Sequence, residues 1–271
     1  MLLCALECSA AQRREEQAPP RERREKEPLT SSGEGGEAYN AVGRVSAAMT
    51  APREGALADA LKAFGLFLLV LAIGGGSSWL VRRCLLFPPW APGLAAQLAF
   101  LSASLLIMRF LRHSWRDFGF RLACQGLARA SLLSLAVASV FAGITAFLLG
   151  GSSGGEGPPG LAEDPLALAL LSLLVAPICE EIFFRGLLQG YLALRGHGRL
   201  SIYVPAVLFT AVHALPFSTS GPAVLTAILA GAFLLGLIAG HLRAASGSLL
   251  HPILAHLWFN LLGYAMRLLA G

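Results

Sequence analysis

Two adjacent carboxylates and an arginine lie within an apolar stretch of the sequence. The acidic pair is Glu180 and Glu181, and Arg185 follows Glu181 by four residues. A charged side chain at the centre of a bilayer costs about 2.5 to 3.5 kcal/mol on insertion scales, so it usually has a partner or a function. Positions 181 and 185 share one helix face and can form an ion pair, which leaves Glu180 without a counter-charge. Such a carboxylate can exchange a proton near neutral pH, as general acid–base chemistry requires.

The same three residues also have a purely structural interpretation, as a clamp between helices. A clamp explains Glu181 and Arg185 well, but it does not need a second carboxylate at Glu180. We therefore predict an acid–base function for Glu180, while Glu181 and Arg185 are explained more simply by the clamp.

Two further apolar segments carry isolated polar side chains. His213 follows Phe209 by one helical turn, so the phenyl ring can pack beside an imidazole that titrates near neutrality. His256 and Asn260 are also one turn apart and can point into one cavity, where two donors can stabilise an oxyanion. Each pattern also fits ordinary packing or a hydrogen bond between helices. Because three separate helices carry such groups, a shared cavity that activates water against a carbonyl is the simplest explanation.

The composition indicates a membrane protein. Of 271 residues, 55% are hydrophobic and only 14% are charged, and the mean hydropathy is +0.65. These values lie outside the usual balance of a soluble domain. The net charge is +5, but the arginines lie at the ends of apolar runs, as topology signals do, so no nucleic-acid partner is predicted.

Apolar runs of spanning length predict an all-α, polytopic transmembrane bundle of about seven helices, whose last four form an intramembrane cavity. Pro177 lies within the fourth run and could divide it into two shorter pieces. The predicted runs are 61–81, 92–111, 130–150, 165–192, 201–217, 222–242 and 248–269.

The chain divides into three parts, the first by its polar composition and the other two by where the polar motifs lie. Residues 1–58 have mixed charge and no apolar periodicity, so we expect disorder there. Met49 opens a compact polar leader before the first apolar run, so residues 1–48 are a candidate over-extended gene start. We expect residues 59–164 to form accessory transmembrane helices and residues 165–271 to form the catalytic core.

Loop charges predict an orientation. The segment 112–129, the pair Arg195 and Arg199, and Arg243 alternate along the chain so that they share one side, which is expected to be the cytoplasm. The N-terminus would then be cytoplasmic and the C-terminus outside. Arg82, Arg83 and Arg267 do not fit this scheme.

Taken together, these motifs resemble those of the CPBP family of intramembrane glutamic endopeptidases, which includes type II CAAX prenyl proteases and bacterial Abi proteins. The family's Glu-Glu-x-x-x-Arg motif is matched at 180–185, Phe-x-x-x-His at 209–213 and His-x-x-x-Asn at 256–260, over about residues 165–265. The resemblance implies that Glu180 and His213 activate the attacking water, and that His256 and Asn260 stabilise the tetrahedral oxyanion. Supporting roles would fall to Glu181, Arg185 and Phe209.

Alternative sites are less well supported. One carboxylate and two histidines could hold zinc, but the sequence lacks the His-Glu-x-x-His motif of zinc proteases and the glutamic mechanism needs no metal, so no cofactor is predicted. The rhomboid-like pattern Gly-Ser-Ser-Gly at 151–154 lies in a polar loop and is better explained as a linker. The only aspartates lie at helix ends or in loops, so an aspartyl site is not predicted: they are Asp59, Asp117 and Asp164.

The predicted function is therefore hydrolysis of a peptide bond near the membrane. The alternative is a membrane scaffold or a proton-coupled transporter that uses the same buried polar groups. The expected partners are the lipid bilayer and a peptide or lipidated protein substrate. The composition suggests a bacterial inner membrane protein, for which bacteriocin-like or C-terminally anchored peptides are a more natural substrate class than prenylated tails.

Overall fold

The computed structural model describes residues 55–84, 87–148 and 164–270 of the chain. Within these ranges the protein consists of helices and their connections, with no strand. The predicted disorder of residues 1–58 and the alternative start at Met49 fall almost wholly outside the described residues, as does the tetrapeptide at 151–154.

Seven helices follow one another along the described residues, as the apolar runs predict. Three precede the fourth and longest helix: α3 (Ala56–Arg83), α4 (Ala91–Phe110) and α5 (Leu127–Leu148). Three follow it: α9 (Gly198–Ala214), α10 (Pro222–Ser246) and α11 (Leu250–Ala270).

The fourth helix runs without a break from Pro165 to Leu194, although it contains Pro177. It starts at the N-cap Asp164, whose carboxylate accepts the Ala167 amide at 3.0 Å. Two stretches have π-helical geometry, so the helix is labelled in five parts. These are α6 (Pro165–Leu170), η1 (Leu171–Val175), α7 (Ala176–Glu181), η2 (Ile182–Leu188) and α8 (Gln189–Leu194). The wider π turn just before Pro177 accommodates the proline, so the helix does not divide there.

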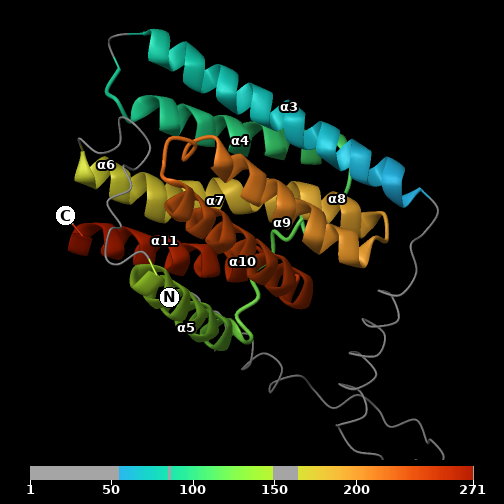
Figure 1. Cartoon of the computed structure of the whole chain (residues 1–271). Helices are drawn as coiled ribbons and strands as arrows, with labels where there is room; N and C mark the ends of the chain where they lie inside the picture. Colours follow the sequence, from blue (N-terminus) through green and yellow to red (C-terminus); the bar gives the residue numbers. More distant parts are fainter. Residues whose placement is uncertain (1–54, 85–86, 149–163, 271) are drawn as a thin grey trace, which may run out of the picture. The chain divides into compact units, whose positions relative to one another are not determined.

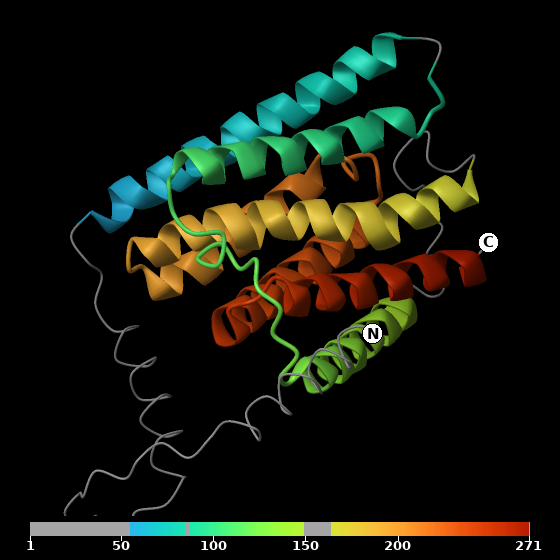
Figure 2. The ribbon, with the colours of Figure 1, turned by 180° about the vertical axis from the view of Figure 1, so that it is seen from behind.

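The long fourth helix lies at the centre of the bundle, with the other helices packed around it in pairs (Figures 1 and 2). On one flank α3 packs along α4, and on another α5 packs along α11. The third pair is α9 with α10, and the central helix contacts a member of every pair. The central helix therefore presents its polar residues to side chains from several helices.

The segment between α4 and α5 is not helical and is held against the turn between α10 and α11. Phe118 in this segment is completely buried. The Gly119 carbonyl accepts the Leu249 amide at 3.0 Å, and Arg243 donates to the Asp117 carbonyl at 2.8 Å. Arg121 donates to the Ser246 carbonyl. These bonds place the basic residues of the α4–α5 segment and the end of α10 on the same side, as the loop charges predict.

Five of the seven helices are long and apolar enough to cross a membrane: α3, α4, α5, the central helix and α10. Helix α9 is apolar but has only 17 residues. Helix α11 has 21 residues, but its histidines and asparagine make it more polar. The two helices outside the five are thus the ones that bring His213, His256 and Asn260 to the central helix.

Candidate active site

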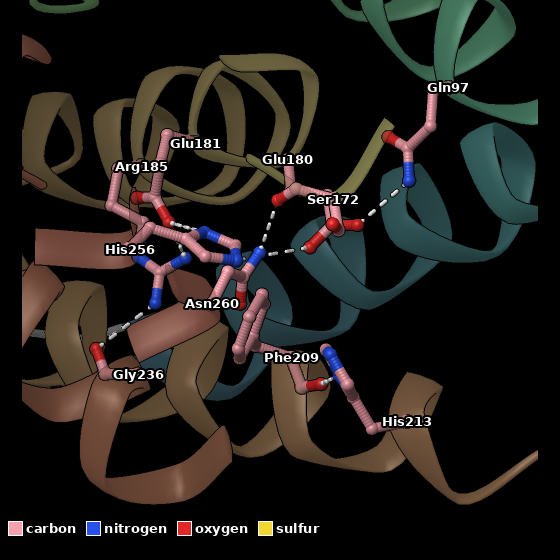
Figure 3. A network of polar contacts seen from close by, with 10 residues as sticks. All are labelled: Gln97, Ser172, Glu180, Glu181, Arg185, Phe209, His213, Gly236, His256 and Asn260. Atoms are coloured by element: carbon pink, nitrogen blue, oxygen red, sulfur yellow. Dashed lines mark hydrogen bonds and ion pairs between the residues drawn. The ribbon is translucent and has the colours of Figure 1, made fainter. Parts of the chain in front are cut away.

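Glu180 and Glu181 lie near the middle of the central helix and have different surroundings (Figure 3). The Glu180 side chain keeps 14% of its surface exposed, and its Oε1 accepts a hydrogen bond from Gln97 Nε2 of α4 at 2.8 Å. The Glu181 side chain has no exposed surface. Its environment is therefore set entirely by the groups that touch it.

Glu181 joins Arg185 and His256 in a buried polar network. Arg185 Nη1 donates to Glu181 Oε1 at 2.8 Å, which confirms the predicted ion pair one turn apart. His256 Nδ1 lies 2.8 Å from the same carboxylate oxygen, and its Nε2 lies 3.9 Å from Glu180 Oε2. His256 therefore stands between the two carboxylates.

The Arg185 guanidinium is held on its other side as well. Its Nη2 donates to the Gly236 carbonyl of α10 at 3.3 Å, and its carbon Cζ lies 4.7 Å from the centre of the Phe209 ring. A cation this close to an aromatic face is attracted by the ring quadrupole. Arg185 is thus anchored by a carboxylate, a carbonyl and a ring, in a site without access to solvent.

Phe209 separates the two histidines. Its ring centroid is 4.6 Å from that of His213 and 5.5 Å from that of His256, so the predicted packing of Phe209 beside His213 is confirmed. His213 Nδ1 lies 2.7 Å from the backbone carbonyl of Phe209, one turn earlier on α9. His213 makes no direct contact with Glu180 among the interactions of the described residues.

Asn260 lies one turn after His256 on α11 and donates from Nδ2 to the backbone carbonyl of Ser172 at 2.7 Å. Ser172 lies in the π-helical stretch η1 of the central helix. The hydroxyl of Ser172 donates to the Leu168 carbonyl at 2.6 Å, so only its backbone carbonyl is involved in holding Asn260.

One cavity of about 720 Å³ is lined by Glu180, His213, His256 and Asn260 together, as well as by Gln97. Besides the last four helices, α3, α4 and α5 also line it, so the cavity is larger than predicted and includes helices from the first half of the chain. Its apolar wall includes side chains from α5, α10 and α11, namely Phe141, Ala142, Ile228, Leu235 and Phe259.

The cavity extends from the middle of the bundle toward one end. Its lining includes Arg82 near the end of α3, Pro89 just before α4, Phe217 between α9 and α10, and Tyr264 near the end of α11. These helix ends all belong to one side of the bundle, opposite the side on which the α4–α5 segment meets the α10–α11 turn.

Sequence patterns did not identify two groups of this site. Gln97 is a single amide in an apolar run and belongs to no motif, although an uncharged polar residue at that depth is itself a weak signal. The Ser172 carbonyl is a backbone group, and only the geometry of the central helix makes it available.

The described residues contain no cluster of side chains that could bind a metal ion. No group of three or more histidine, cysteine, aspartate or glutamate side chains there is arranged to hold an ion.

Comparison with known proteins gives one family. Residues 162–262 match the family model described as "Type II CAAX prenyl endopeptidase Rce1-like". No curated protein and no solved structure matches the chain. The matched range contains Glu180, His213, His256 and Asn260 but excludes Gln97.

Proposed function

We propose, from the premise that this chain belongs to the CPBP family of CAAX-type proteases, that it is an intramembrane endopeptidase whose water-activating groups are Glu180 and His213. The family whose model matches is one of peptidases, and five helices are long and apolar enough to span a membrane. The observation that carries the proposal is that Glu180, His213, His256 and Asn260 line one cavity near the middle of the bundle.

The hydrogen bonds of the two histidines support different roles for them. His213 Nδ1 is placed to donate its hydrogen to the Phe209 carbonyl, which leaves Nε2 with its lone pair as a proton acceptor. His256 has a carboxylate near each ring nitrogen. When both ring nitrogens carry a hydrogen, Nδ1 donates to Glu181. The Nε2 hydrogen then stays available, because Glu180 Oε2 at 3.9 Å lies beyond hydrogen-bond distance.

The proposed reaction divides the work between the two sides of the cavity. A water molecule donates one hydrogen bond to Glu180 and the other to Nε2 of His213, and one proton passes to Glu180 as the water oxygen attacks the carbonyl carbon of the substrate. The resulting oxyanion accepts hydrogen bonds from Nε2 of His256 and from the second Nδ2 hydrogen of Asn260. The tetrahedral intermediate then collapses, the C–N bond breaks, and the proton passes to the leaving amine.

The proposal extends to cofactor, substrate and location. The reaction needs no metal, because the base and the oxyanion donors are protein side chains. The apolar cavity wall fits a hydrophobic or lipidated peptide segment held at membrane depth. We place the protein in a bacterial inner membrane with a cytoplasmic N-terminus.

The test is cleavage of a labelled membrane-anchored peptide by the purified protein in lipid vesicles. Glu180→Gln and His213→Ala should each lower kcat by at least about 100-fold, because general acid–base groups contribute 10²- to 10⁴-fold. Both variants should keep the unfolding temperature of the wild type to within a few degrees, and a chelator should leave the wild-type rate unchanged.

Two results would contradict the proposal. Full cleavage by Glu180→Gln would exclude Glu180 as the activating group. A wild-type protein that binds the peptide but never cleaves it, while tolerating Glu180→Gln, would instead indicate a scaffold or transporter.

A further inference from the structure

We infer that Pro177 is a positioning residue for Asn260, because it leaves the Ser172 carbonyl free to accept the Asn260 side chain. The inference rests on the proposed function, in which Asn260 is an oxyanion donor. Pro177 is buried in α7, three residues before Glu180, and does not itself line the cavity.

The backbone of the central helix explains why this carbonyl is free. A carbonyl in an α-helix accepts the amide four residues later, and one in a π-helix accepts the amide five residues later. For Ser172 these amides belong to residues 176 and 177. The Ala176 amide donates instead to Leu171, and a proline at 177 has no amide hydrogen.

Asn260 supplies the missing donor from another helix. A buried carbonyl without a partner costs free energy, so a hydrogen bond from outside the helix is favoured. The Asn260 Nδ2 atom lies 2.7 Å from the Ser172 oxygen. The π turn and the proline together therefore create an acceptor on the surface of the central helix, facing α11.

This hydrogen bond also orients the rest of the Asn260 amide. The two hydrogens of an amide nitrogen lie in one plane at a fixed angle, so fixing one hydrogen restricts the direction of the other. Asn260 lines the cavity beside His256 and Glu180. A donor held in place before the reaction stabilises an oxyanion without having to reorganise.

Pro177→Ala should weaken this arrangement specifically. Alanine restores an amide hydrogen at position 177, where it can bond to the Ser172 carbonyl in the π-helical register. The backbone then competes with Asn260 for the acceptor. The side chains of Glu180, His213 and His256 are unchanged, so the expected loss is in Asn260 orientation alone.

The first experiment is a double-mutant cycle on turnover in lipid vesicles. Asn260→Ala should lower kcat by about 100-fold or more, and Pro177→Ala by about 10- to 100-fold, each with little change in KM. The double variant should be as slow as Asn260→Ala alone. If Pro177→Ala lowers kcat by the same factor in the wild type and in Asn260→Ala, Pro177 acts only on the general fold and the inference is overturned.

The second experiment repeats the cycle on thermal unfolding and needs no activity. Asn260→Ala should lower the unfolding temperature by about 2 °C when Pro177 is present, as expected for one hydrogen bond between membrane helices. It should have almost no effect when Pro177→Ala is present. Equal shifts in the two backgrounds would show that Pro177 does not govern the bond, whatever the protein catalyses.

Pro205→Ala is the matched control, since Pro205 is a buried proline inside α9. Any effect of Pro205→Ala on kcat or on the unfolding temperature should simply add to the effect of Asn260→Ala. Glu180→Gln, measured alongside, separates the two proposals. If that variant cleaves fully the proposed function fails, and the unfolding cycle still decides whether Pro177 governs the Asn260 bond.

Discussion

Glu180 and Glu181 are neighbours in the chain, yet the fold gives them different surroundings. The Glu181 side chain has no exposed surface, and its Oε1 is in hydrogen-bond contact with both the Arg185 guanidinium and the His256 imidazole. Glu180 faces the cavity and is held by the neutral amide of Gln97. An amide orients a carboxylate by a hydrogen bond without adding a positive charge, so the surroundings of Glu180 suit the role of base that we propose for it, while Glu181 belongs to the buried network.

The Gln97 bond leads to a prediction at this scale. Gln97→Leu keeps the volume but removes the donor, and hydrogen bonds to charged groups are worth about 1.5 to 3 kcal/mol. We expect kcat to fall by about 10-fold or more, measured by cleavage of the same labelled peptide. Ser104→Ala is the control, because Ser104 is fully buried on the same helix but does not line the cavity; an equal loss in that variant would show a general disturbance of α4.

At the scale of elements, close packing of α9 and α10 brings His213 and the Gly236 carbonyl to the central helix. A Cβ added at Gly236 would lie 3.0 Å from the Ala206 Cβ and 3.1 Å from its Cα. These atoms belong to the backbone or are bonded directly to it, so no change of side-chain rotamer can move them away. Small residues at such contacts let membrane helices approach closely.

Gly236→Ala should therefore separate the two helices and lower stability by about 1 to 3 kcal/mol, as overpacking does. Thermal unfolding of the purified protein measures the change. Gly75→Ala in α3 is the control, since an added Cβ there meets nothing within 4 Å and alanine favours a helix over glycine by about 1 kcal/mol. Opposite shifts in unfolding temperature are expected, and a stabilised Gly236→Ala variant would contradict this packing argument.

At the scale of the whole membrane unit, the cavity opens on the side away from the basic connections. Arg121 and Arg243 lie where the α4–α5 segment meets the α10–α11 turn, while Arg82 and Phe217 line the other end, at the cavity. If the basic side faces the cytoplasm, as loop charges predict, substrates enter from the outer side. The location of the opening then limits which peptides can reach Glu180.

The orientation can be tested by chemical labelling of two native cysteines on opposite sides of the bundle. Cys84 is exposed beside the end of α3, and Cys124 lies in the α4–α5 segment. In variants that retain only one cysteine, a membrane-impermeant maleimide added to intact cells should label Cys84, and should label Cys124 only after lysis. The reverse pattern would place the cavity opening on the cytoplasmic side and favour cytoplasmic substrates.

The sequence by itself determined the helices and the pairs of residues within them. Hydropathy and side-chain spacing are local properties, so the seven runs, the Glu181–Arg185 ion pair and the Phe209–His213 contact could all be predicted. The order of the three polar motifs was likewise enough to indicate the family whose model matches residues 162–262.

Only the tertiary structure decided which groups meet across helices. It paired His256 with Glu181, Gln97 with Glu180, and Asn260 with a backbone carbonyl that a π turn and Pro177 leave free. It also placed α5 beside α11 instead of beside α4. Such contacts depend on how helix surfaces fit together, and no fixed spacing along the chain encodes that fit.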